Sequence, residues 1–146
     1  MVFILFVLFI LSHTKSEVSM DHSPGFLRLV DEVQPRVREI DVGTVRERLA
    51  HGARFFDVRE DREWDAAHPL GAEHLGKGVI ERDIERTVPD PGTEVVLMCG
   101  GGFRSALAAD ALQRMGYTNV WSVAGGWRAW QAANLPIEAG NTGDGA

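Results

Sequence analysis

Segments typical of strands alternate with segments typical of helices from Ser23 onward, and this alternation limits the fold more than any other feature of the sequence. The strand-like runs are 55–58, 72–75, 94–98 and 119–123, and the helical runs are 23–32, 44–49, 60–67, 79–86, 105–115 and 126–133. Such an alternation usually folds into parallel strands joined by right-handed helical crossovers. We therefore predict an α/β domain with a central, mostly parallel sheet of about five strands flanked by helices.

The run 94–98 (EVVLM) is the strongest strand candidate, because successive β-branched and apolar residues suit a strand that is covered on both faces. The residues that follow it are Cys99, Gly100, Gly101, Gly102, Phe103, Arg104 and Ser105, and there a helix is predicted to begin. Open parallel sheets bind ligands beyond the carboxyl ends of their strands. Cys99 is therefore predicted to stand where such a fold binds its ligand.

The loop after this strand has the composition of an anion cradle. Three successive glycines allow positive φ angles and leave backbone N–H groups uncovered, and the helix that follows directs its positive end at the sulfur. Arg104 adds a planar cation that can bind an oxyanion with two hydrogen bonds. We expect Cys99 to be a reactive thiolate near neutral pH. The alternative is a glycine-rich turn beside a structural cysteine, which leaves the combination of strand, thiol, glycines, Arg104 and helix start unexplained.

Composition excludes several classes of function. A chain of 146 residues suits one domain, and its net charge of −6 disfavours nucleic acid and anionic membranes as partners. With one cysteine there is no internal disulfide, and neither the cysteine nor the five histidines have metal-ligand spacing. A phosphate-binding P-loop is disfavoured because Gly-Lys-Ser/Thr is missing. We expect no metal and no cofactor.

The two ends of the chain differ from its middle. Residues 1–19 contain an apolar run, Val2 to Leu11, that is too short for a stable membrane span, since about twenty residues are needed. Its length fits a signal peptide, but no Lys or Arg precedes it and no A-x-A site follows. We favour an upstream extension before a start at Met20, hence a cytoplasmic protein; the alternative is an export signal or anchor. Residues 20–38 are predicted as a helix and lead-in, and 139–146 as a disordered tail.

Four motifs together resemble the rhodanese family over residues 39–138. They are Asp57-Val58-Arg59-Glu60 with Trp64, Leu70-Gly71-Ala72 with His74-Leu75, the loop Cys99-Gly-Gly-Gly-Phe-Arg104-Ser105, and Gly125-Gly126-Trp127. The loop is similar to the family's C-x-x-G-x-R-S pattern, and the resemblance implies a three-layer domain. One segment departs from the family's G-H-(I/L)-P-G-A, because the chain has Pro69 before Leu70 rather than after it. Pro69 should hold His68 in an extended conformation.

The resemblance implies a sulfurtransferase. Cys99 would take sulfane sulfur from thiosulfate or another persulfide donor and pass it to cyanide or a thiol, with residues 100–105 binding the substrate. Asp57 and Arg59 would support the loop, although a purely structural ion pair is the alternative. His68 and His74 are interpreted as structural and Trp127 as a core residue. The alternative function is a sulfur carrier or partner-binding module that delivers to an acceptor protein; inactive modules of this kind usually lose the cysteine.

The spacing between Cys99 and Arg104 separates this chain from phosphatases and arsenate reductases of similar fold. Those enzymes have C-x5-R, whereas this loop is C-x4-R and makes a smaller cradle, suited to one sulfur atom rather than a tetrahedral phosphate. Arg104 is also the only cation in the loop. Because small dianions gain from additional positive charge, we expect modest activity with thiosulfate and room at the rim for a bulkier donor.

Overall fold

The computed structural model describes residues 22–140, and its secondary structure follows the predicted alternation. Its helices are α2 (Pro24–Val33), α3 (Val45–Ala50), α4 (Asp61–Ala66), α5 (Ile80–Thr87), α6 (Phe103–Arg114) and α7 (Gly126–Ala132), with short 3₁₀ helices at Gln34–Arg36 and Val42–Thr44. Its strands are β1 (Arg38–Ile40), β2 (Arg54–Asp57), β3 (Ala67–Pro69), β4 (Glu73–His74), β5 (Val95–Met98), β6 (Val120–Val123) and β7 (Ile137–Ala139). The hypotheses about residues 1–19 fall outside the described residues.

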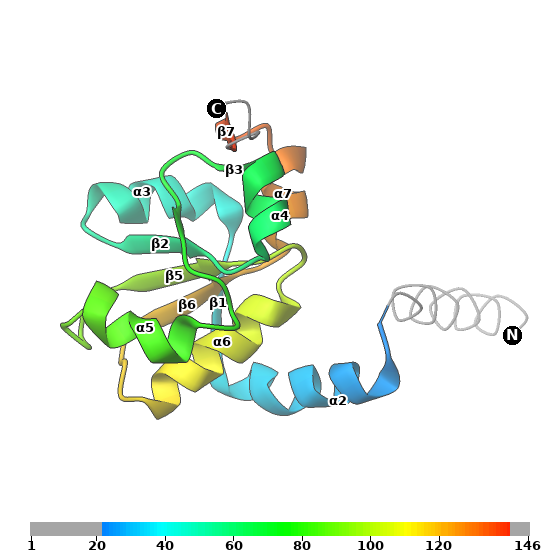
Figure 1. Cartoon of the computed structure of the whole chain (residues 1–146), viewed down its shortest axis with the longest axis vertical. Coiled ribbons are helices and arrows are strands. Elements are labelled where there is room, and N and C mark those ends of the chain that lie inside the picture. The colour runs from blue at the N-terminus through cyan, green and yellow to red at the C-terminus, as the bar shows by residue number, and fades with distance from the viewer. Residues whose placement is uncertain (1–21, 141–146) are drawn as a thin grey trace, which may run out of the picture. The chain divides into compact units, whose positions relative to one another are not determined.

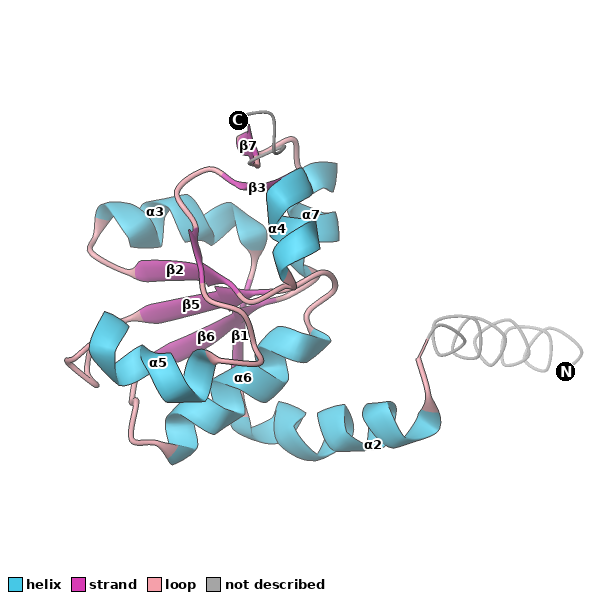
Figure 2. Ribbon diagram, in the orientation of Figure 1, coloured by secondary structure: helices cyan, strands magenta, loops and turns pink. Residues whose placement is uncertain are grey.

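Five strands form a parallel sheet in the order β1-β6-β5-β2-β4, which confirms the predicted fold class. Figures 1 and 2 show α3 on one of its faces and α5 and α6 on the other. One face packs against α5 and α6, and the other against the segment around α3 and against α7. The strongest strand predicted from the sequence, β5, occupies the centre of this sheet.

The side chains of β5 explain why the sheet is covered on both faces. All four residues of the strand are buried. Val95 and Leu97 belong to the core on the α5–α6 face, whereas Val96 and Met98 pack on the opposite face with Trp130 of α7. Successive side chains of a strand point to opposite faces, so an apolar run without polar interruption is what a central strand requires.

A second, two-stranded antiparallel sheet joins β3 to β7 and was not predicted from the sequence. Ala67 pairs with Ala139 in this sheet, so the strand includes the first residue of the predicted tail; residues 141–146 lie outside the described part. His68 lies in β3 with extended backbone, as the following Pro69 predicts.

The chain divides into two units, with the boundary between Glu32 and Val33. Most of α2 belongs to the first unit, and this helix begins at Pro24 directly after Ser23, as predicted. The sheet and the cysteine loop belong to the second unit. Within residues 22–140, no helix combines the length and the apolar character needed to cross a membrane.

Candidate active site

Cys99 lies at the carboxyl end of the central strand, directly before the loop that leads into α6. Its side chain is buried, with 1% of the residue surface exposed. The backbone N–H of Gly102 donates to the Cys99 sulfur over 3.1 Å, and the left-handed backbone of Gly102 (φ +107°) then turns the chain into α6. The predicted loop therefore curls around the sulfur, and one backbone amide already points at it.

Two buried serines continue the polar contacts of the sulfur. The Cys99 sulfur lies 3.4 Å from the Ser105 hydroxyl, and this hydroxyl lies 2.7 Å from that of Ser122 on β6. A hydroxyl can rotate, so Ser122 can donate to Ser105 while Ser105 donates to a negatively charged sulfur. The sequence indicated Ser105 but not Ser122, although a small polar residue inside the apolar strand VWSV was a signal for it.

The turn at Gly125 and Gly126 holds the loop from behind. The backbone N–H of Trp127 donates to the Cys99 carbonyl oxygen over 2.7 Å, and that of Arg128 donates to the Gly100 carbonyl oxygen over 3.1 Å. Gly126 has φ +51°, and a side chain there would collide with the Cys99 carbonyl. The structure therefore explains Gly126 in the motif Gly125-Gly126-Trp127, since only glycine allows this close approach to the Cys99 carbonyl.

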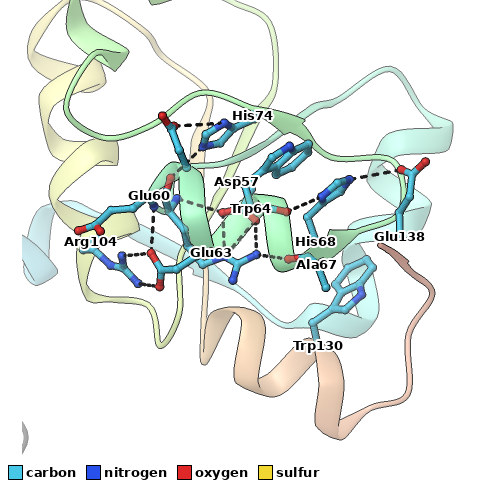
Figure 3. Close-up of polar contacts among 12 residues, drawn as sticks. Asp57, Glu60, Glu63, Trp64, Ala67, His68, His74, Arg104, Trp130 and Glu138 are labelled. Atoms are coloured by element: carbon cyan, nitrogen blue, oxygen red, sulfur yellow. Dashed lines mark hydrogen bonds and ion pairs between the residues drawn. The ribbon is translucent and has the colours of Figure 1, made fainter. Parts of the chain in front are cut away.

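Arg104 is paired with an acidic side chain that the sequence did not indicate. Its two terminal nitrogens donate to the Glu63 carboxylate on α4 over 2.8 and 3.1 Å, as Figure 3 shows. The hydrogen bond from Arg104 lowers the pKa of Glu63 to about 2, and the same bond, with a smaller contribution from the charge of Cys99, raises the pKa of Arg104. The loop's only cation is thus largely neutralised by α4 rather than free for an oxyanion.

This ion pair makes stability depend on pH. We expect Glu63→Gln to lower the free energy of unfolding by about 1 kcal/mol near neutral pH, since the pair is partly exposed and screened. The folded-state pKa of about 2 lies below the ordinary 4.5, so the stabilisation is complete above pH 4.5 and is lost as the pH falls through about 2.

Urea unfolding of the wild type and the variant would test this dependence. The difference between them should shrink from neutral pH to about pH 3, whereas a Glu47→Gln control at an exposed position of α3 should show no such trend. A difference that stays constant over this range would contradict the role of the carboxylate charge.

Asp57 and Arg59 form a buried ion pair and reach the cysteine loop through Trp127. The Arg59 guanidinium donates to the Asp57 carboxylate at 2.8 Å and to the Ala67 carbonyl oxygen at 2.7 Å. It also lies over the Trp127 ring, 4.6 Å from its centroid, and Trp127 in turn donates to the Cys99 carbonyl. The geometry therefore shows the structural ion pair that the sequence left as an alternative, with an indirect connection to the loop.

Two histidines stack on Trp64 at one side of this ion pair. The ring centroids of Trp64 and His68 are 3.4 Å apart, and those of Trp64 and His74 are 4.9 Å apart. His68 Nδ1 forms a hydrogen bond with the Trp64 carbonyl oxygen at 3.0 Å, as drawn in Figure 3. His74 Nε2 forms one with the Arg59 carbonyl oxygen at 2.9 Å. These contacts agree with the structural interpretation of both residues. Over residues 22–140, no cluster of three or more His, Cys, Asp or Glu side chains could hold a metal.

The chain belongs to the rhodanese-like domain family, whose model matches residues 41–133. It is 38% identical over 87 residues to a protein named thiosulfate sulfurtransferase GlpE from Vibrio cholerae, an alignment that covers 60% of this chain and 80% of the relative. This relationship agrees with the four motifs from which the family was inferred.

Solved structures with the same fold are described in different functional terms. One is a protein of unknown function from Rhodopseudomonas palustris described as a possible tyrosine phosphatase, with a TM-score of 0.68 and 29% identity over 80% of this chain and 96% of that one. Another is described as a rhodanese with anions from E. coli, with a TM-score of 0.53 and 30% identity over 60% of this chain and 99% of that one. The arrangement of the sheet and helices is thus common to proteins described in different functional terms, and the chemistry must be argued from the loop.

Proposed function

We propose that this protein is a sulfurtransferase that carries sulfane sulfur as a persulfide on Cys99. The observation that carries the proposal is the position of the Cys99 sulfur, which is buried at the end of the central strand and accepts a hydrogen bond from Gly102 N–H. The Vibrio cholerae relative is named a thiosulfate sulfurtransferase, which supports the same chemistry.

The proposed reaction has two steps at one sulfur atom. With thiosulfate, the Cys99 thiolate attacks the outer sulfur, the sulfur–sulfur bond of thiosulfate breaks, and sulfite leaves with the electron pair. A nucleophile such as cyanide or a thiolate then takes the outer sulfur, and the electron pair returns to Cys99. This is covalent catalysis of the ping-pong type. The Gly102 amide N–H, 3.1 Å from the sulfur, would stabilise negative charge on it, and the Ser105 hydroxyl, which accepts from the thiol at 3.4 Å, would donate to the thiolate after rotating.

The pairing of Arg104 with Glu63 bears on the choice of donor. A small dianion such as thiosulfate would have to compete with the Glu63 carboxylate for the only cation of the loop. This supports modest use of thiosulfate and a preference for a less highly charged persulfide donor. Delivery of sulfur to an acceptor protein, with little turnover on small molecules, is the second candidate, because a loop whose cation is already paired with Glu63 binds small anions weakly.

Intact mass spectrometry tests the proposed persulfide. The purified protein is treated with thiosulfate or with a low-molecular-weight persulfide, and we expect the mass to increase by one sulfur atom. Addition of cyanide should return the mass to its starting value. Protein whose cysteine is first blocked with iodoacetamide is the control and should gain no sulfur. If the unblocked protein gains no sulfur from either donor, the proposal is wrong.

A further inference from the structure

A cavity of about 770 Å³ lies beside the cysteine loop and shares Arg104 with it. Its other walls are the residues after β2, from Val58 to Arg62, and the segment from His74 to Val79 that joins β4 to α5, with Asp83 at one side. Both segments follow strands of the parallel sheet, so the cavity lies at the carboxyl ends of the strands, as Cys99 does. It is much larger than a single sulfur oxyanion requires.

The charged side chains of this cavity are paired, with one exception among the cations. Three arginines of the cavity have an acidic partner: Arg59 pairs with Asp57, Arg104 with Glu63, and Arg62 lies 3.6 Å from Glu60. The Asp83 carboxylate pairs with Arg82 and Arg86. Asp61 faces His74 at 3.8 Å. The remaining cation is Lys77, and no carboxylate of residues 22–140 pairs with its ammonium group.

The backbone of Lys77 is held in place, and its side chain forms no ion pair with any residue of 22–140. Its N–H donates to the Val58 carbonyl oxygen over 3.0 Å, which attaches the segment after β4 to the end of β2. Glycines stand on both sides of it, and a side chain at Gly78 would meet no atom within 4 Å. Lys77 is also the only lysine of residues 22–140, where every other permanent cation is an arginine. The Lys77 side chain is only partly exposed, but a lysine side chain is long and flexible, so its ammonium group can follow the position of an anionic ligand.

We propose that this cavity binds the body of a small thiol that bears a carboxylate, with the carboxylate on Lys77 and the thiolate directed at Cys99. Val58, Leu75 and Val79 supply apolar wall for a short aliphatic chain. The inference rests on the proposed function and names the class of acceptor. The acceptor thiolate attacks the outer sulfur of the Cys99 persulfide, the sulfur–sulfur bond breaks, and its electron pair returns to Cys99 as a thiolate. The product is the persulfide of the small thiol.

Two acceptors that differ only in charge test the role of Lys77. Persulfide-loaded protein is mixed with 3-mercaptopropionate or with its neutral amide, and the rate of sulfur release is followed against acceptor concentration. In Lys77→Gln we expect the half-saturating concentration of the carboxylate to rise about five- to tenfold, the effect of losing one hydrogen bond of ordinary net strength. The amide should be affected far less, and Lys77→Arg should restore the preference for the carboxylate.

Arg46→Gln is the matched control for net charge, because Arg46 is exposed on α3 and does not line the cavity. Arg46→Gln should leave unchanged the ratio of the half-saturating concentrations of the carboxylate and its amide. If Lys77→Gln slows both acceptors equally, or if Arg46→Gln changes the ratio as much, the assignment of the carboxylate to Lys77 is wrong.

A measurement without sulfur transfer separates this inference from the proposed function. Cys99 is alkylated with negatively charged iodoacetate or with neutral iodoacetamide. We expect the rate with iodoacetate, divided by the rate with iodoacetamide, to fall in Lys77→Gln and to be kept in Lys77→Arg. A protein that forms no persulfide but shows this change would refute the proposed function and retain the anion site. A protein that forms the persulfide but shows neither the acceptor effect nor the alkylation effect would refute the anion site alone.

Discussion

Replacement of Cys99 by serine is expected to lower sulfur transfer by on the order of a thousandfold or more, because a hydroxyl cannot carry the persulfide on which both steps depend. The substitution should leave the fold intact. A serine oxygen at the position of the sulfur would have the Gly102 N–H as donor and the Ser105 hydroxyl as partner, so no buried polar group loses its hydrogen bond. We expect the free energy of unfolding to change by no more than about 1 kcal/mol.

Two assays on wild type and Cys99→Ser separate a loss of sulfur transfer from a loss of the fold. Thiocyanate formation from thiosulfate and cyanide reports sulfur transfer, and urea unfolding reports the fold. Transfer that survives in Cys99→Ser at more than a tenth of the wild-type rate would contradict the role of Cys99.

The same proteins should be assayed with an aryl phosphate, because one structural neighbour is described as a possible tyrosine phosphatase. The C-x4-R loop leads us to expect no hydrolysis; hydrolysis that disappears in Cys99→Ser would overturn that expectation.

The parts of the fold that the sequence predicted are those with strong local signals. β5 was evident from four successive apolar residues before a cysteine and three glycines, and α6 from the alanine-rich run that follows. β1 was missed because it has three residues, two of them exposed and charged, and its pairing with β6 joins segments about 80 residues apart. β3 and β7 were missed for a similar reason: each has three residues and one contains a proline.

The candidate site shows the same division between local and long-range signals. The loop residues could be named because they follow one another in the chain, and Asp57 with Arg59 because they belong to a recognisable motif. Glu63 and Lys77 could not be assigned, since nothing near them in the sequence indicates that one would bind Arg104 and the other line the cavity that Arg104 also lines. Both belong to segments that follow strands of the parallel sheet, so the topology and not the local sequence brings them to the loop.

Substitution of Gly126 by alanine is expected to cost about 3 kcal/mol or more of stability and to impair sulfur transfer with it. Two effects combine at this position. The backbone has φ +51°, and the added carbon would overlap the carbonyl of Cys99 and come within 3.0 Å of the Gly100 carbonyl carbon. These are backbone atoms of the cysteine loop, which cannot move aside without breaking the bonds from Trp127 and Arg128 that hold it.

Gly116→Ala is the matched control, because Gly116 also has a positive φ, +106°, but no atom within 4 Å of an added carbon. It should cost about 1–2 kcal/mol from backbone strain alone and leave sulfur transfer intact. The difference between the two variants in urea unfolding then measures the collision with the loop, separately from the strain. If Gly126→Ala proves no more destabilising than Gly116→Ala and transfers sulfur at the wild-type rate, the turn before α7 does not hold the loop in place. The expected result would instead assign Gly126 a direct part in positioning Cys99, because the atoms nearest to the new methyl are backbone atoms of Cys99 and Gly100.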